Sequence, residues 1–408
     1  MENAGIVIIG AGQAAASLAA RLRSKGHAGA ITIIGAEPLA PYQRPPLSKA
    51  YLLGDMPLDR LLLRSDEFWA EQNITLRLGQ RVTAIDATAK TVTLGDEVLA
   101  YEQLALTTGA TPRRLPAAMG GDLDGVFTVR NLADIDGLKP LCRAGAAMVV
   151  IGGGYIGLEA ASVASKLGMM VTVIEAAPRI LGRVASPETA QAIREMHDAH
   201  RVRILEGVGI EALVGSNHVT AVRLAGGAEI AADIVITGIG VTPDTDLAEA
   251  AGLACENGIA VDAYGQTSAP AVWAAGDCAS FPYGAGPSGT GRLRLESVGN
   301  AIDMAELVAD NMLGAGIAYV PKPWFWSDQF DEKLQIAGLN TGYDRIVTRI
   351  SEAGQSFWYY AGERLLAVDA LNDSRAYMVG KRLIEAGRSP DPVAIADPAT
   401  DLKALLKA

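Results

Sequence analysis

The stretch Ile6-Val7-Ile8-Ile9-Gly10-Ala11-Gly12-Gln13-Ala14-Ala15 decides the fold that we expect for this chain. The β-branched run predicts a buried strand, G-x-G-x-x-A predicts a tight turn, and the residues from Ala15 to Arg23 predict a helix. In this layout the glycines let the backbone approach a pyrophosphate, and the N-terminus of the helix faces its negative charge. The stretch therefore predicts a dinucleotide-binding unit.

The same arrangement recurs at Met148-Val149-Val150-Ile151-Gly152-Gly153-Gly154-Tyr155-Ile156-Gly157. Each fingerprint is followed by a second hydrophobic strand that leads to an acid, Glu37 in the first unit and Glu175 in the second, where a carboxylate could accept hydrogen bonds from ribose hydroxyls. A single fingerprint is also compatible with an ordinary tight turn in another α/β protein. Two complete units in one chain favour two dinucleotide sites.

Length, composition and charge narrow the class of protein. The chain has 408 residues, 50% of them hydrophobic, which predicts two or three domains with well-filled cores. The net charge of −11 argues against a nucleic-acid partner or an anionic membrane surface. The stretch 4–20 is uncharged, but no basic segment precedes it and glycines interrupt it, so it does not have the pattern of a secretory signal peptide. No run reaches the roughly 18 consecutive apolar residues of a transmembrane helix. We expect a cytoplasmic protein.

The cysteines exclude several kinds of site. Cys142, Cys255 and Cys278 are far apart in sequence and form no C-x-x-C pair. A disulfide framework, a zinc site or an iron-sulfur cluster of the chain's own is therefore not expected, and we predict no metal site.

Three domains are predicted from the order of the segments. Residues 1–111 and 238–318 form the first, because the strand that ends at Gly276-Asp277 returns the chain to the first dinucleotide unit. Residues 112–237 form the second. Residues 319–408 change character: they contain Trp324, Phe325 and Trp326 and alternating strands at 334–339, 345–350 and 365–371, which predict a C-terminal α+β domain.

Together the motifs resemble those of the glutathione reductase superfamily, and within it the putidaredoxin reductase-like branch of FAD-dependent NADH:ferredoxin reductases from bacterial monooxygenase and dioxygenase systems. The resemblance covers the whole chain. It is carried by Gly10-Ala11-Gly12-Gln13-Ala14-Ala15, Arg44-Pro45-Pro46-Leu47-Ser48-Lys49, Thr108-Gly109-Ala110, Gly152-Gly153-Gly154-Tyr155-Ile156-Gly157-Leu158-Glu159, Ala275-Gly276-Asp277 and Trp324-Phe325-Trp326-Ser327-Asp328-Gln329. It implies two Rossmann-like domains, the first for FAD and the second for NADH, and a C-terminal domain that covers the flavin.

The resemblance also implies which residues bind the two cofactors. On the FAD side these are Gly10, Gly12 and Ala14 at the pyrophosphate, Glu37 at the ribose, Asp277 at the ribitol or phosphate, and Ala15, Arg44, Val82, Thr108, Gly109, Arg130, Gly276 and Val298. On the NADH side they are Gly152, Gly154, Tyr155, Ile156, Gly157 and Glu175. Many relatives have Gly-Asp-Glu after the second strand, whereas this chain has Gly35-Ala36-Glu37. Either Glu37 alone binds the adenosine ribose, or the ribose is held less tightly.

Three residues are implied to act in the reaction. Lys49 would lie near flavin N5 with Glu159 as its partner, because a cation there favours reduction and a buried cation needs a counter-charge. Trp326 would lie beside the isoalloxazine. The alternatives are that Lys49 is an ordinary surface lysine, and that the aromatic residues belong to a core, with Trp324 or Trp358 as the flavin contact.

The predicted reaction is hydride transfer from NADH to FAD, then transfer of single electrons to a transiently bound two-iron, two-sulfur ferredoxin that feeds a cytochrome monooxygenase or a ring-hydroxylating dioxygenase. The segment 41–49 has no cysteine, which argues against a disulfide reductase. A rubredoxin reductase and a nucleotide-sensing flavoprotein that acts through protein interactions remain as alternatives. Asp303, Glu306 and Asp310 recur at helical spacing and would repel an acidic ferredoxin. Docking would then use basic residues such as Arg292, Arg294, Lys381 or Arg382, or the acidic residues are simply a solvated face, which is the interpretation that we favour.

Overall fold

The computed structural model describes residues 5–284 and 291–407, which form two compact units. The first unit comprises the chain up to Gln43, Leu58–Thr111 and Thr242–Pro323. The second comprises Arg44–Pro57, Pro112–Val241 and the chain from Trp324 onward.

A five-stranded parallel sheet in the order β19-β7-β1-β2-β3 forms the centre of the first unit. Its strands are β1 (Ile6–Ile9), β2 (Ile31–Ile34), β3 (Ile74–Arg77), β7 (Gln103–Leu106) and β19 (Val272–Ala274). β1 and β2 are buried along their whole length, as expected for β-branched runs in a covered parallel sheet. Because the strands are parallel, the loops after β1, β2, β7 and β19 leave the sheet at one edge.

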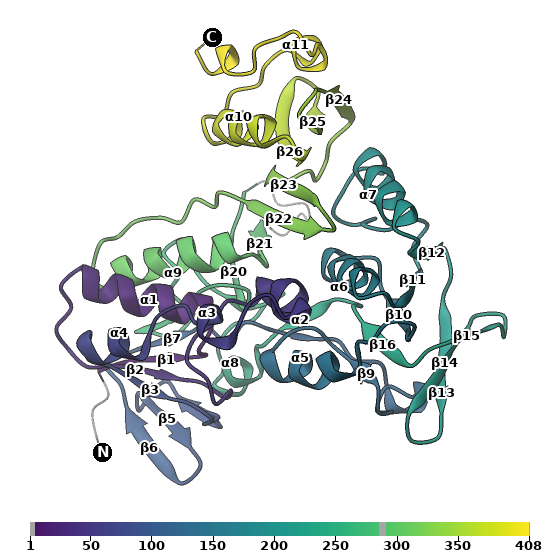
Figure 1. Ribbon diagram of the computed structural model, residues 1–408. Coiled ribbons are helices and arrows are strands. Elements are labelled where there is room, and N and C mark those ends of the chain that lie inside the picture. The colour runs from purple at the N-terminus through teal and green to yellow at the C-terminus, as the bar shows by residue number, and fades with distance from the viewer. Residues whose placement is uncertain (1–4, 285–290, 408) are drawn as a thin grey trace. The chain divides into compact units, whose positions relative to one another are not determined.

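Two helices lie side by side on this sheet, α1 (Gln13–Ser24) and α9 (Val298–Met312), as Figure 1 shows. Arg21 of α1 donates two hydrogen bonds to Asp310 of α9, at 2.8 and 2.7 Å, and lies 3.8 Å from Glu306. The interpretation of the acidic residues as a solvated face was therefore wrong for Asp310, whose side chain is only 11% exposed. Helix packing supplies its counter-charge.

The other elements of the first unit are short. They are α3 (Leu58–Leu61), α4 (Asp66–Glu71), β4 (Ala84–Asp86), β5 (Thr91–Leu94), β6 (Glu97–Ala100), α8 (Asp246–Ala250), β18 (Ile259–Ala260), β20 (Ala279–Pro282) and β21 (Arg292–Leu293). Strands β8 (Ala110–Pro112) and β17 (Val241–Pro243) pair where the chain passes between the units.

A second parallel sheet, in the order β12-β11-β10-β16-β9, belongs to the second unit. Its strands are β9 (Val126–Phe127), β10 (Ala147–Ile151), β11 (Met170–Glu175), β12 (Arg203–Glu206) and β16 (Ile234–Thr237). The helices of this part are α2 (Ala50–Leu53), α5 (Leu132–Leu138), α6 (Tyr155–Lys166) and α7 (Pro187–Ala199), and the 3₁₀ turn η1 (Pro45–Ser48) precedes α2. An antiparallel meander of β13 (Ile210–Gly215), β14 (Val219–Leu224) and β15 (Glu229–Ala231) is inserted before β16.

The C-terminal part of the second unit is an antiparallel sheet in the order β22-β23-β26-β25-β24. Its strands are β22 (Trp324–Gln329), β23 (Glu332–Gly338), β24 (Arg345–Ile350), β25 (Gln355–Ala361) and β26 (Arg364–Leu371), followed by α10 (Ser374–Glu385) and α11 (Pro392–Ala396). The predicted fold class, two Rossmann-like units and a C-terminal α+β part, is confirmed. The division into three domains with the boundaries given above stays a prediction. No helix in the described part of the chain has both the length and the apolar content that crossing a membrane requires.

Candidate active site

The first fingerprint is a tight turn from β1 into α1. Gly10 has φ +104°, and a Cβ there would lie 2.2 Å from the carbonyl oxygen of Thr107, so only glycine fits. Gly12 caps α1, and a Cβ at Gly12 would meet nothing within 4 Å. Ala14 and Ala15 are buried in the first turn of the helix. The backbone at the start of α1 thus borders open space, as a pyrophosphate requires.

Most other residues predicted on the FAD side gather at the same edge of this sheet. Thr108 follows β7 and donates to the carbonyl oxygen of Asp244 at 2.7 Å, and Gly109 follows it with φ +77°. Gly276 and Asp277 follow β19, and Glu37 follows β2, where Tyr42 donates to its carboxylate at 2.5 Å. The convergence follows from the parallel register of β1, β2, β7 and β19.

Two single positions of the same prediction lie in this unit as well. Val82 is buried in the hydrophobic core that includes β1 and α1. Val298 is the half-buried first residue of α9. Burial in a core is also what an ordinary valine shows, so the geometry alone gives Val82 no special role.

The second fingerprint repeats the turn between β10 and α6. Gly152 has φ +106°, and a Cβ there would lie 2.3 Å from the carbonyl oxygen of Gly238. Gly154 caps α6 and faces open space, whereas a Cβ at Gly157 would lie 2.4 Å from the carbonyl oxygen of Gly152. The three glycines therefore serve the turn, the approach of a ligand and the close packing of helix on strand. The side chain of Ile156 is exposed.

Glu175 ends β11 beside this turn. Its two carboxylate oxygens accept hydrogen bonds of 2.7 Å each from the backbone N–H groups of Gly153 and Ala177. These bonds hold the carboxylate against the fingerprint, at the place where the acid of a Rossmann unit binds ribose hydroxyls. Sequence spacing predicted this position, and the hydrogen bonds explain how the acid is held there.

Tyr155 is the first residue of α6. Its ring lies 5.0 Å from that of Phe325, measured between centroids, and its hydroxyl is buried without a hydrogen-bond partner among the described residues. Burial raises the pKa of this hydroxyl well above its ordinary value.

Lys49 and Glu159 form an ion pair inside the second unit, with Lys49 Nζ 2.9 Å from Glu159 Oε1. Lys49 follows η1, and Glu159 lies on the buried face of α6. Two hydroxyls also donate to the carboxylate: Ser48 to Oε2 at 2.8 Å and Ser327 of β22 to Oε1 at 2.7 Å. The surface-lysine alternative does not describe Lys49, whose side chain is 17% exposed and paired.

Burial dominates the electrostatics of Glu159, whose side chain is 5% exposed. It raises the pKa of the carboxyl group, while Lys49, Ser327 and Ser48 act in the opposite direction. A buried carboxylate of this kind stays ionised only if its donors remain in place, so the geometry of the hydroxyls is part of the site.

Arg44 and Arg130, predicted on the FAD side, contact each other within the second unit. Arg44 Nη1 donates to the carbonyl oxygen of Arg130 at 2.7 Å. The N–H of Arg130 donates to Asp134, which closes a capping box at the start of α5 with Asn131.

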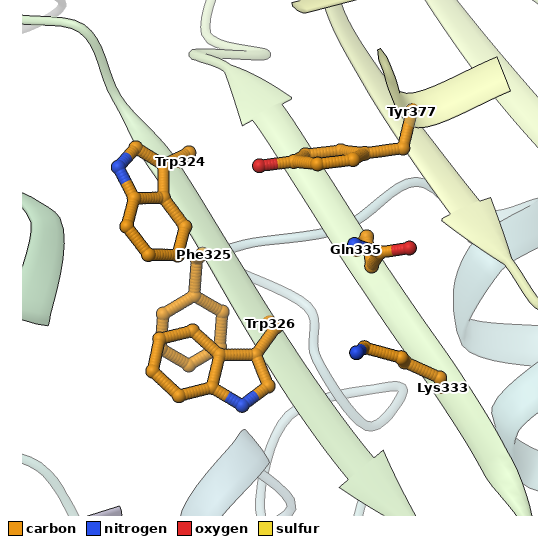
Figure 2. Close-up of a pocket in the computed structure, with 6 residues that line it drawn as sticks. All are labelled: Trp324, Phe325, Trp326, Lys333, Gln335 and Tyr377. Carbon is orange, nitrogen blue, oxygen red and sulfur yellow. The ribbon is translucent and has the colours of Figure 1, made fainter. Parts of the chain in front are cut away.

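Trp326 lies on β22, on the face of the strand opposite to Ser327. Figure 2 shows Trp326 and Trp324 on one strand and Lys333 and Gln335 on the next, with Tyr377 of α10 beside them. These residues and Phe325 line a pocket of about 200 Å³, and the two indole rings stack at 5.5 Å. Trp358, by contrast, is fully buried in the core of the C-terminal sheet. The core alternative thus applies to Trp358 and not to the Trp324–Trp326 pair.

Ser48, Ser327 and Gln329 were not predicted as site residues, although all three lie in the quoted motifs. Ser48 precedes Lys49, and Ser327 and Gln329 follow Trp326. Their position inside motifs that carry the resemblance was the feature from which a role could have been predicted. The three cysteines are free thiols, and burial raises the pKa of Cys278.

Comparison with known proteins agrees with this geometry. Residues 4–305 match the family model of the pyridine nucleotide-disulphide oxidoreductases, and residues 324–406 match the model described as reductase C-terminal. A ferredoxin–NAD(P)(+) reductase of a Sphingomonas species is 42% identical over 402 residues, 98% of this chain and 96% of the relative. Putidaredoxin reductase of Pseudomonas putida is 39% identical over 414 residues, 100% of this chain and 97% of the relative.

A solved structure extends the similarity to three dimensions. The crystal structure of the covalent putidaredoxin reductase–putidaredoxin complex matches with a TM-score of 0.94 and 38% identity, covering 100% of this chain and 98% of that one. The open space at the starts of α1 and α6, which a Cβ at Gly12 or Gly154 would enter, fits the two dinucleotides of such an enzyme. This chain therefore belongs to the pyridine nucleotide-disulphide oxidoreductase family and is an oxidoreductase that uses FAD and NAD(H).

Proposed function

We propose that this protein is an NADH-dependent ferredoxin reductase that supplies single electrons to a two-iron, two-sulfur ferredoxin of an oxygenase system. The observation that carries the proposal is the buried Lys49–Glu159 pair, a fixed cation next to a fixed anion. The similarity over nearly the whole chain to a ferredoxin reductase supports the choice of acceptor. The binding is expected to be transient, because an electron carrier must leave after each transfer.

In the proposed arrangement the starts of α1 and α6 hold the two pyrophosphates, and Glu37 and Glu175 hold the adenosine riboses. Bound there, FAD would supply the redox chemistry: acceptance of a hydride from NADH, then release of its two electrons one at a time and of a proton to solvent. Lys49 stabilises the negative charge that develops during this step, and Glu159 keeps Lys49 in position. Cys142, Cys255 and Cys278 are free thiols.

The pocket on β22 is the proposed exit for the electrons. Trp324 and Trp326 offer a half-buried aromatic surface, and Lys333 adds a positive charge at its border. Ferredoxins are acidic, so a positive border favours encounter, and aromatic rings are frequent at the centres of such interfaces.

The experiment is a comparison of electron acceptors with the purified, FAD-loaded protein. With NADH as donor we expect fast reduction of cytochrome c when an oxygenase ferredoxin is present and little without it. A rubredoxin reduced as fast as the ferredoxin or faster would contradict the proposed acceptor. Failure to reduce even ferricyanide with NADH would contradict the proposed reaction and favour a sensing role.

A further inference from the structure

A line of hydrogen bonds leads from the Lys49–Glu159 pair to a buried histidine that the proposed reaction does not use. Ser327 Oγ donates to Glu159 Oε1 at 2.7 Å, Gln329 Nε2 donates to Ser327 Oγ at 3.0 Å, and Gln329 Oε1 lies 2.7 Å from Nε2 of His197. His197, Ser327 and Gln329 are each at most 2% exposed. The line joins α6, β22 and α7 within the second unit.

The hydrogen-bonding capacities fix the direction of this line. Gln329 Oε1 can only accept, so His197 Nε2 must carry a proton. If the Gln329 amide were turned over, its oxygen would face Ser327 Oγ. Two acceptors, this oxygen and Glu159 Oε1, would then compete for the single hydroxyl proton of Ser327. His197 Nδ1 is buried without a partner among the described residues, and a bare acceptor costs less there than an unsatisfied N–H. Each donor therefore points toward Glu159.

We infer that His197, Gln329 and Ser327 are positioning residues that orient the Glu159 carboxylate toward Lys49 through a one-directional chain of hydrogen bonds. The inference rests on the proposed role of the Lys49–Glu159 pair. Hydrogen bonds aligned in one direction polarise each other in a region of low dielectric. The N–H of His197, two hydrogen bonds before Ser327, therefore strengthens the bond from Ser327 to the carboxylate. Neutral His197 serves as the first donor, and burial lowers its pKa and keeps it neutral.

The line of hydrogen bonds ends at Glu159 on one side and at His197 on the other. Glu159 faces Lys49 and the two serines. His197 faces Gln329, and His200 and Asp198 act on it electrostatically. Both His197 and His200 contact the ring of Phe330, at centroid distances of 5.1 and 3.7 Å. His200, however, is not a member of the line of hydrogen bonds that leads to Glu159. His200 is therefore a matched control.

The test follows the protonation of Glu159 in the FAD-loaded protein by infrared spectroscopy, using the carboxylic-acid C=O band that disappears in Glu159→Gln. We expect Ser327→Ala to raise the proton affinity of Glu159 about tenfold, equivalent to about 1.4 kcal/mol. His197→Leu should act in the same direction by a smaller factor, and the flavin midpoint potential should become more positive in both variants. His197→Gln keeps an N–H donor and should keep the wild-type titration of Glu159. His200→Leu removes an electrostatic neighbour of His197 but leaves its donor in place, and should shift the titration of Glu159 far less than His197→Leu does.

The inference would be overturned if the titration of Glu159 shifted equally in His197→Leu and His197→Gln, or equally in His197→Leu and His200→Leu. The hydrogen bonds would then only tie α7 to β22. If the variants do not fold, nitrogen NMR of the wild type decides: the Nε2–H form of His197 supports the chain, and the Nδ1–H form or an imidazolium at neutral pH refutes it. The infrared and the NMR measurements require neither NADH nor ferredoxin. A wild type that fails with NADH while keeping these signals would refute the proposed function and leave the chain intact.

Discussion

Lys49 is held by its surroundings more firmly than a lysine on a surface turn would be. It has a carboxylate at 2.9 Å, and that carboxylate has two hydroxyl donors of its own. Such a group can stabilise developing negative charge without reorganising at the moment of reaction. The role beside a flavin remains a prediction.

Changing Lys49 to Met should slow flavin reduction by NADH about a hundredfold, the usual size for the loss of one electrostatic donor, measured by stopped flow with FAD still bound. Glu159→Gln should have a smaller effect, because the lysine remains. If the pair acts as a unit, the double variant should be little slower than Lys49→Met. Lys139→Met, in the same unit, is the control and should reduce at the wild-type rate. Strictly additive losses would mean that the two residues act separately.

Glu175 should set the choice of nucleotide. Its carboxylate is fixed at the fingerprint and would repel a 2′-phosphate, so we expect NADH to be preferred over NADPH by at least about tenfold in kcat/KM, or about 1.4 kcal/mol. Glu175→Ala should bring the ratio toward one. Glu37→Ala, the equivalent change after the first fingerprint, should not alter it. Equal efficiency of the two nucleotides in the wild type would place Glu175 away from the ribose.

At the scale of single elements, α7 is joined to the C-terminal sheet through a buried acid. Asp369 of β26 accepts hydrogen bonds from Thr189 of α7, at 2.8 Å, and from Tyr359 of β25. Burial raises the pKa of Asp369 to about 6, above its ordinary value of 3.8. A carboxyl group with a raised pKa in the folded state binds its proton there more tightly than in the unfolded state. Its contribution to stability is present at low pH and is lost as the pH rises through about 6.

Asp369→Asn should therefore remove a pH dependence. Between pH 5 and pH 7.5 the wild type should lose about 1.4 kcal/mol of unfolding free energy relative to the variant, because the linked proton is released over this interval. Urea denaturation of both proteins at several pH values measures the difference. Parallel curves for the two proteins would show that Asp369 titrates near its ordinary pKa.

β22 connects two parts of the proposed mechanism. Its residues alternate, so that Ser327 and Gln329 point to the Glu159 side while Trp324 and Trp326 line the pocket. Trp326→Ala should reduce ferredoxin-dependent cytochrome c reduction much more than ferricyanide reduction, since ferricyanide is small and needs no docking surface. Trp324→Ala, the stacked neighbour, is the control and should show a smaller difference. Equal losses with both acceptors would make Trp326 a general support and not an exit.

Local patterns were sufficient for the elements and insufficient for the contacts between them. The alternation of residues 345–350 predicted β24 to the residue, and the glycine spacing predicted both turns, because these depend on neighbours in sequence. Lys49 was predicted as a partner of Glu159 from the resemblance of whole motifs. Two other partners, Ser327 of Glu159 and Arg21 of Asp310, come from a strand and a helix distant along the chain, and no spacing rule joins them. For this reason Ser327 was missed, and the interpretation of Asp310 as part of a solvated face was wrong.

At the scale of the whole molecule, both units contain a fingerprint, and the second also contains the Lys49–Glu159 pair and the tryptophan pocket. The chain matches relatives over almost its entire length, including the C-terminal part. In the proposed function, the division of a hydride into single electrons uses all of these parts.

The most direct test is an anaerobic titration of the FAD-loaded protein with NADH in the presence of an oxidised oxygenase ferredoxin. The loss of NADH absorbance and the reduction of the ferredoxin are recorded in the same sample. We expect two ferredoxin molecules to be reduced for each NADH consumed, with no NADH consumption beyond flavin reduction when the ferredoxin is left out. NADH that is oxidised while the ferredoxin stays oxidised would contradict it.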